Sequence, residues 1–285
     1  MKIKVMQSKW VLGFIGVLLS IGACKSSRDW GPIEPGNDPN FLIEAHSDEG
    51  LGDFNRKVVV FGIDIYAVPD VEDEKLLHAA NVMAQYLDND EDGLVDDTLV
   101  WSKMIEQRAF VVMWKRENDL NIDPPADRLG QDLGNDETEP DYVINGKIGP
   151  FDASLEEILH IINFAGHALA YPSSFGLAVG SDLANAMDIA RGGQFFDVPD
   201  EYPAEAWYTY DDETCSYADC QTIEYLYWAI TSLMGGQENR LDEIGHEWRL
   251  NTPALVESGD TAIFELLTNP TFKIPVNLPD GRYRQ

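Results

Sequence analysis

The segment from Ser154 to Ala170 constrains the fold most, because it predicts an almost wholly apolar helix that must lie inside a protein. Apolar side chains occupy two faces of the helical wheel, which is the pattern of a buried helix. Helical spacing aligns the four polar exceptions in one stripe: Glu156, His160, Asn163 and His167. A buried charge without a partner is costly. The stripe therefore predicts a metal ion, a cleft or a hydrogen-bond network facing it.

Residues 156–160, with the sequence Glu-Glu-Ile-Leu-His, resemble the His-Glu-x-x-His motif of zincin metallopeptidases, with glutamate in place of the first histidine. The resemblance implies that Glu156 and His160 bind zinc and that Glu157 is the catalytic general base. It leaves two candidates for the third ligand, His167 or a downstream glutamate. That glutamate is Glu224, on a predicted apolar helix at 221–234.

The same residues also have a purely structural interpretation. Ser154 and Glu157 stand three positions apart, as in a capping box, where the glutamate only ties down the start of the helix. Glu156 would interact favourably with the helix dipole, and the two histidines would be core residues with hydrogen-bond partners. Three hypotheses stay open at this stage: a metal or catalytic site, a non-catalytic polar network, and a ligand cleft without metal.

A run of aspartates at 88–97 separates two predicted helices and resembles the EF-hand loop. In that comparison the calcium ligands are side-chain oxygens and one backbone carbonyl, from Asp88, Asp90, Asp92, Leu94 and Asp96. Gly93 supplies the sharp turn. Position twelve is Leu99 instead of a bidentate glutamate, so we expect weak, structural calcium binding over 88–99. The alternative is a solvated acidic turn.

The first residues predict an exported lipoprotein. Lysines precede a short apolar run, and small residues precede Cys24, which resembles the lipobox of bacterial lipoproteins. We expect a signal peptide at 1–23, lipidation of Cys24 and a flexible tether at 24–53 rich in Gly, Pro and Ser. The lipid would anchor the protein to a bacterial membrane outside the cytoplasm. The alternative is an ordinary secretory signal.

The formal charge of −30 argues against nucleic acid as a partner, because the protein and the nucleic acid are both negatively charged and would repel each other. The apolar content of 44% predicts a real core rather than a disordered acidic chain. Lipidation of Cys24 leaves Cys215 and Cys220, which we expect to form a disulfide in an oxidising compartment. A thiolate metal site is the alternative.

Together these patterns predict a single α+β domain at 54–285. It would be mainly helical, with a small sheet from the 57–68 and 109–115 regions packed by helices, and zincin-like by resemblance. Residues 118–141 are predicted to be a surface loop.

The first functional hypothesis is an extracytoplasmic calcium-binding lipoprotein with a zincin-like hydrolase site for peptides or proteins, and zinc as a second metal. The second is a non-enzymatic lipoprotein with a calcium-dependent binding or structural role. The aspartate loop, the Glu-Glu-x-x-His helix and a Tyr-Thr-Tyr-Asp-Asp segment at 208–212 also resemble a family of secreted proteins from which no activity can be transferred.

Overall fold

A computed structural model describes residues 38–116, 119, 125 and 127–284. These belong to one compact unit, Ile33–Gln285. The predicted signal peptide and Cys24 lie outside the described residues. Within the described ranges, no helix has the length and apolar character needed to span a bilayer.

The sheet has four strands in the order β1-β2-β3-β4: β1 (Arg56–Val60), β2 (Ile63–Ala67), β3 (Phe110–Trp114) and β4 (Gly130–Gly134). The β1–β2 pair is antiparallel and the other two pairs are parallel. The strand expected at 57–68 is therefore a hairpin. Phe61 and Gly62 turn it with φ values of 48° and 85°, the positive values that a two-residue hairpin turn requires.

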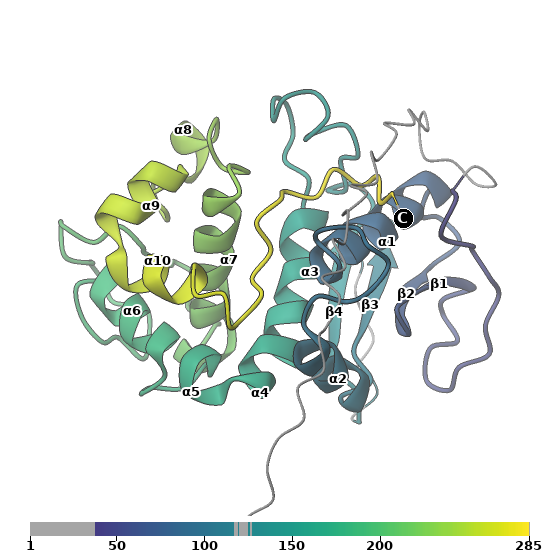
Figure 1. Cartoon of the computed structure of the whole chain (residues 1–285), viewed down its shortest axis with the longest axis horizontal. Coiled ribbons are helices and arrows are strands. Elements are labelled where there is room, and N and C mark those ends of the chain that lie inside the picture. The colour runs from purple at the N-terminus through teal and green to yellow at the C-terminus, as the bar shows by residue number, and fades with distance from the viewer. Residues whose placement is uncertain (1–37, 117–118, 120–124, 126, 285) are drawn as a thin grey trace, which may run out of the picture. The chain divides into compact units, whose positions relative to one another are not determined.

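Helices α1 (Asp73–Leu87) and α3 (Ser154–Ile162) cover one face of this sheet (Figure 1). The interface is built from aliphatic side chains of both layers, such as Ile65 and Val111 from the strands and Leu76 and Ile158 from the helices. Helix α2 (Thr98–Glu106) follows α1 after the acidic loop. The expected mainly helical α+β fold with a small sheet is confirmed.

The opposite face of the sheet is covered by the segment before β1. Leu51 and Phe54 pack there on a group of strand side chains, Tyr66, Phe110, Val112 and Trp114. Glu44 and Lys57 form an antiparallel bridge, with N–O distances of 2.9 and 2.8 Å. Part of the range 38–53, which the sequence assigns to the tether, is thus attached to the sheet through Leu51 and Glu44. A few apolar side chains in a Gly- and Pro-rich segment are enough to bury this face.

The helix predicted from Ser154 to Ala170, which we call the motif segment, is not α-helical throughout. After α3 the chain forms a π-helix, η2 (Asn163–His167), and then the short α4 (Ala168–Ala170). Helix α2 packs against η2, and Gly166 makes this approach possible. A Cβ atom at Gly166 would lie 2.7 Å from Val100 Cγ1, a distance that real Cβ atoms do not reach.

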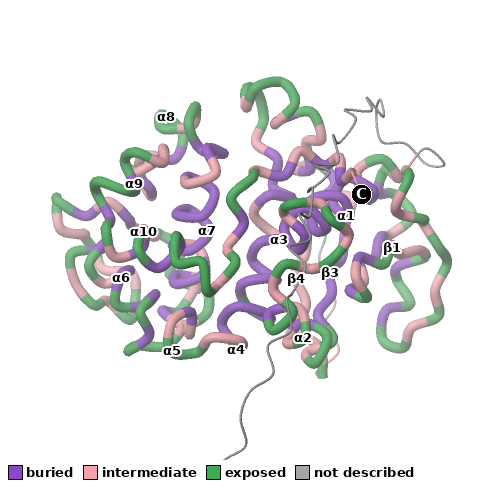
Figure 2. The backbone as a smooth tube through the Cα atoms, viewed as in Figure 1, coloured by how far each residue is buried: buried purple, intermediate pink, exposed green. Residues whose placement is uncertain are grey.

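The second half of the chain forms a helical layer beside α3. Its elements are α5 (Pro172–Phe175), α6 (Asp182–Ala190), η3 (Tyr217–Gln221), α7 (Thr222–Leu233), α8 (Leu241–Ile244), α9 (Pro253–Gly259) and α10 (Thr261–Leu267). Helix α7 is buried along most of its length and packs on α3 (Figure 2). This contact brings the two site helices together.

The C-terminal residues return from α10 to α1 as an extended segment (Figure 1). Gln85 Oε1 accepts hydrogen bonds from the backbone N–H groups of Asp280 and Gly281, at 3.0 and 2.9 Å. The Tyr283 N–H donates to Asn81 Oδ1 at 3.0 Å. The last residues are therefore fixed to the helix that leads into the acidic loop.

Candidate metal centre

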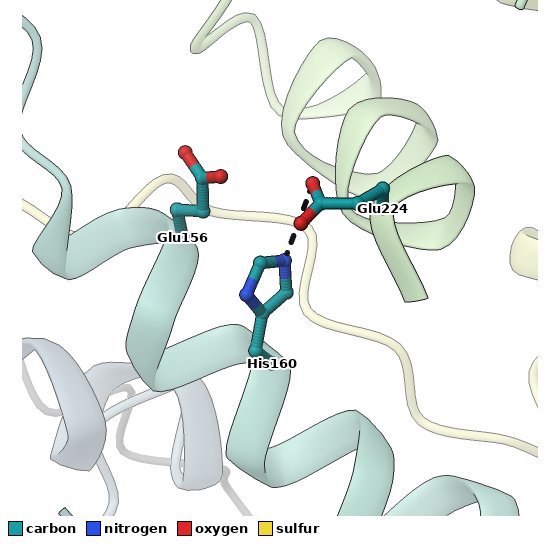
Figure 3. A group of neighbouring side chains, drawn as sticks. All are labelled: Glu156, His160 and Glu224. Atoms are coloured by element: carbon teal, nitrogen blue, oxygen red, sulfur yellow. Dashed lines mark ion pairs between the residues drawn. The ribbon is translucent and has the colours of Figure 1, made fainter. Parts of the chain in front are cut away.

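One histidine and two glutamates converge where α3 meets α7 (Figure 3). Glu156 and His160 lie one turn apart on α3, and Glu224 lies in the first turn of α7. One potential ligand atom from each residue lies within 4.8 Å of the other two. His160 Nε2 is 3.6 Å from Glu224 Oε2, which is longer than a hydrogen bond.

His160 Nε2 is a buried atom that finds no hydrogen-bond partner among the described residues. The His160 residue is only 6% exposed. Buried polar atoms without a partner are rare in native proteins, so each one requires an explanation. Here the nitrogen faces carboxylate oxygens, which are metal ligands of a compatible type.

The other ring nitrogen of His160 faces Glu157. His160 Nδ1 lies 3.3 Å from Glu157 Oε2, which also accepts a hydrogen bond from Gln131 Nε2 on β4. A carboxylate beside one ring nitrogen fixes the orientation of the imidazole and leaves the other nitrogen for a metal. Gln131 was not predicted, because it lies in the presumed loop.

The capping box, which was the structural alternative for Ser154 and Glu157, is not formed. The Ser154 backbone N–H donates to Asp152 Oδ1 at 3.3 Å, and the Ser154 hydroxyl donates to Asp152 Oδ2 at 2.8 Å. Asp152 therefore holds the start of α3, and the Glu157 carboxylate points to β4 and His160 instead.

The crowding of carboxylates around one imidazole shifts the pKa values of the cluster. Burial, followed by the neighbouring charges of Glu224 and Glu157, raises the pKa of Glu156 to about 8. Burial alone would lower the pKa of His160, but Glu224 and Glu157 raise it well above its usual value. In the absence of a metal, protons supply the positive charge that these crowded carboxylates require.

A pocket of about 240 Å³ opens beside this cluster. His160 and Glu224 line it, together with residues of β4, η2 and η3 that include Gln131, Phe164 and Asp219. His160 and Glu224 are thus placed at a cavity, whereas Glu156 is not part of its lining.

His167 does not join this group. It is 3% exposed, and its ring packs on Phe175 with centroids 5.5 Å apart. Its Nδ1 has no hydrogen-bond partner in the described part of the chain. Burial lowers the pKa of His167 to about 4. The π-turn explains the difference from the predicted stripe, because i→i+5 bonding rotates later side chains away from α-helical positions.

The acidic loop brings together part of its predicted ligand set. Oxygen atoms of Asp88, Asp90 and Asp96 lie within 4.8 Å of one another, whereas Asp92 is not in this group. Asp92 Oδ1 accepts the Leu94 N–H at 2.9 Å. Burial, followed by the charges of the other aspartates, raises the pKa of Asp96, as expected for crowded carboxylates without a cation.

The loop is also held by groups that the sequence pattern did not identify. The Asp88 carboxylate is fully buried and accepts hydrogen bonds from the backbone of Asp92 and Gly93, and from the Tyr283 hydroxyl. Gly93 has a φ of 91°, which suits its expected role in the turn. Asp97 caps α2 by accepting from the N–H groups of Leu99 and Val100 at 2.9 and 3.1 Å.

Cys215 and Cys220 are paired, with Cα atoms 5.5 Å apart, as expected from the cysteine count. The pair lies at η3, directly before the helix that carries Glu224. Cys220 also lines the pocket.

The sequence did not predict a third group of potential metal ligands, which consists of Asp211, His246 and Glu247. A backbone bridge between Tyr208 and Trp248 brings these distant segments together. Burial, followed by the charges of Glu224 and Asp211, raises the pKa of Glu247 to about 7. The aromatic and acidic composition of 207–213 was the available signal, but its pairing with 246–248 cannot be read from a local pattern.

Comparisons with protein-family models, curated proteins and solved structures found no match.

Proposed function

We propose that this protein is a zinc-dependent hydrolase of peptide bonds, stabilised by calcium, with Glu156, His160 and Glu224 as its zinc ligands. The observation that carries the proposal is the buried His160 Nε2 atom, which has no hydrogen-bond partner among the described residues and lies 3.6 Å from Glu224 Oε2, in a group of potential ligands that Glu156 completes. Three protein ligands leave a fourth position for water, as catalytic zinc sites require. Zinc bound there would lower the pKa of its water towards neutrality.

Glu157 has two proposed tasks. Through Oε2 it holds the His160 ring, so that Nε2 is directed towards the other ligands. Both of its described contacts use Oε2, and we assign the role of general base to Oε1. The 21% exposure of the Glu157 side chain is compatible with access for a substrate water.

The calcium part of the proposal places an ion among Asp88, Asp90 and Asp96, with the Leu94 carbonyl as a further ligand. Its role would be structural. The loop joins α1 to α2, and α2 packs on η2 in the motif segment. Fixing the loop therefore helps to fix the helix that carries His160.

We further propose that the protein works outside the cytoplasm and is attached to a bacterial membrane through acylated Cys24. The order of lysines, apolar run and lipobox supports this location. The Cys215–Cys220 pair is compatible with an oxidising compartment.

One observation favours the second hypothesis, a non-enzymatic calcium-dependent binding lipoprotein. Glu157 is already engaged by Gln131 and His160, and a polar network of this kind can serve structure alone. The two hypotheses differ in whether zinc binds at His160 and whether Glu157 is needed for turnover.

The test is a calorimetric titration of zinc into zinc-free protein. Saturating calcium is present throughout, so that zinc does not compete for the acidic loop. We expect one zinc site, weakened at least about 100-fold by His160→Ala or Glu224→Gln, because each removes a direct ligand. Glu257→Gln, at an exposed position of α9, is the matched control and should bind like the wild type. Equal zinc affinity in all four proteins would refute the site.

Turnover of a peptide mixture then separates the two hypotheses. Glu157→Gln should retain zinc but lose most hydrolysis, since the amide cannot accept the proton. A zinc-loaded wild-type protein that hydrolyses no peptide would support the non-enzymatic hypothesis.

A further inference from the structure

The pocket beside His160 has walls of two different kinds. Phe164 and Ile223 supply apolar surface, and Phe164 is 38% exposed, unusually open for a large aromatic side chain on the buried motif segment. The charged groups of the lining are the carboxylates of Asp219 and Glu224, in addition to His160. None of the described residues that line it is lysine or arginine.

Asp219 is the carboxylate of this lining that the zinc proposal does not use. It lies on η3, and the Ser216 hydroxyl donates a hydrogen bond to its Oδ2. The neighbouring Cys220 is cross-linked to Cys215, which restrains the turn that carries Asp219. The carboxylate is therefore held at the pocket by local contacts, and the metal centre does not require it.

We infer that this pocket binds the cationic side chain of a substrate, lysine or arginine, with Asp219 as the specificity-determining residue. The inference rests on the proposed peptide hydrolysis and names its substrate class. The methylene stem of such a side chain would lie against Ile223 and Phe164. Its charged end would pair with Asp219, and the Phe164 ring would add a cation–π contact.

The size of the pocket agrees with one side chain. Its 240 Å³ is below the roughly 300–1,000 Å³ typical of sites for drug-sized ligands. An acidic side chain would meet the carboxylate of Asp219, which the zinc proposal does not use, and should be disfavoured.

The experiment compares three peptides that differ at one position, which carries arginine, norleucine or glutamate. We expect the wild type to have a kcat/KM at least about tenfold higher for arginine than for norleucine, and lowest for glutamate. Asp219→Asn should lose most of the arginine preference and retain turnover of the norleucine peptide. Glu213→Gln removes an exposed carboxylate of the same segment that does not line the pocket, and it should behave like the wild type.

A binding measurement with the zinc-loaded protein separates this inference from the proposed activity. Butylguanidine should bind more tightly than uncharged butylurea, and Asp219→Asn should remove the difference. Hydrolysis without preference for a cationic residue would overturn the inference and leave the hydrolase intact. Absence of hydrolysis with selective butylguanidine binding would overturn the hydrolase and leave a cation-selective pocket. Equal binding of the two probes would overturn the inference in either case.

Discussion

The two ring nitrogens of His160 face different carboxylates, and this division is the basis of the candidate site. Nδ1 lies beside Glu157, and Nε2 faces Glu224. Histidines that bind metals through one nitrogen commonly place the other beside a carboxylate or carbonyl. The arrangement therefore gives Glu157 and Glu224 different tasks: Glu157 orients the imidazole, and Glu224 lies beside the nitrogen that would bind the metal.

His167 should make stability depend on pH. Burial lowers its folded pKa to about 4, below the ordinary histidine value, so the unfolded chain takes up more protons between these two pH values. Stability should thus fall as the pH falls from 6.5 to 4, by up to about 3 kcal/mol from this residue. Urea unfolding across that range should show a smaller fall for His167→Gln than for the wild type. The exposed His246→Gln serves as control, and an unchanged profile for His167→Gln would contradict this assignment.

The polar stripe and the resemblance to zincins together predicted Glu156 and His160, with either His167 or Glu224 as the third ligand, and the structure brings Glu224 to the site. The sequence did not identify Gln131 or Asp219 as their neighbours. Both lie in short segments whose position depends on long-range packing, on β4 and η3. Local periodicity carries no information about such contacts.

Among the elements, the motif segment shows where helical spacing stops being informative. The predicted stripe assumed one continuous α-helix, but the chain changes to π-helical bonding at Asn163. Residues before this point lie as predicted, and His167 after it does not. Such π-segments occur often at functional sites, and neither propensity nor hydrophobic pattern predicts them.

The strands show a related limit. The apolar run of β3 was predicted, whereas β4, with the sequence Gly-Gln-Asp-Leu-Gly, lacks the β-branched residues that mark a strand. Packing explains the glycine at position 130. A Cβ atom at Gly130 would lie 2.5 Å from the ring of Phe110, so glycine lets β4 pair closely with β3.

The acidic loop between α1 and α2 should stabilise the protein only when calcium is present. With a dissociation constant near 10⁻⁴ M, as in extracellular calcium modules, about 10 mM calcium would contribute about 2.7 kcal/mol. This corresponds to a rise of roughly 5–10 °C in Tm for a chain of this size. Scanning calorimetry of Asp90→Asn combined with Asp96→Asn should show no rise, while the exposed Asp242→Asn retains it. The buried Asp88 is left intact because its hydrogen bonds also support the metal-free loop.

Across the described part of the molecule, excess carboxylates gather in three groups with the geometry to hold a cation. A formal charge of −30 destabilises a compact chain through self-repulsion, and bound cations would relieve it.

The sequence predicted the α+β class because apolar helices and short strands were distinct. It could not predict that Leu51 and Phe54 cover a sheet face or that the C-terminal segment packs on α1, because both depend on tertiary contacts.

The central claim is that a metal ion belongs between α3 and α7, and anomalous diffraction at the zinc edge tests it most directly. Crystals grown with zinc should give a strong peak within ligand distance of His160 Nε2, Glu156 and Glu224. The same crystals from His160→Ala should lose that peak. A zinc-soaked wild-type crystal with no peak there, and with a water or a direct His160–Glu224 hydrogen bond in its place, would contradict the account.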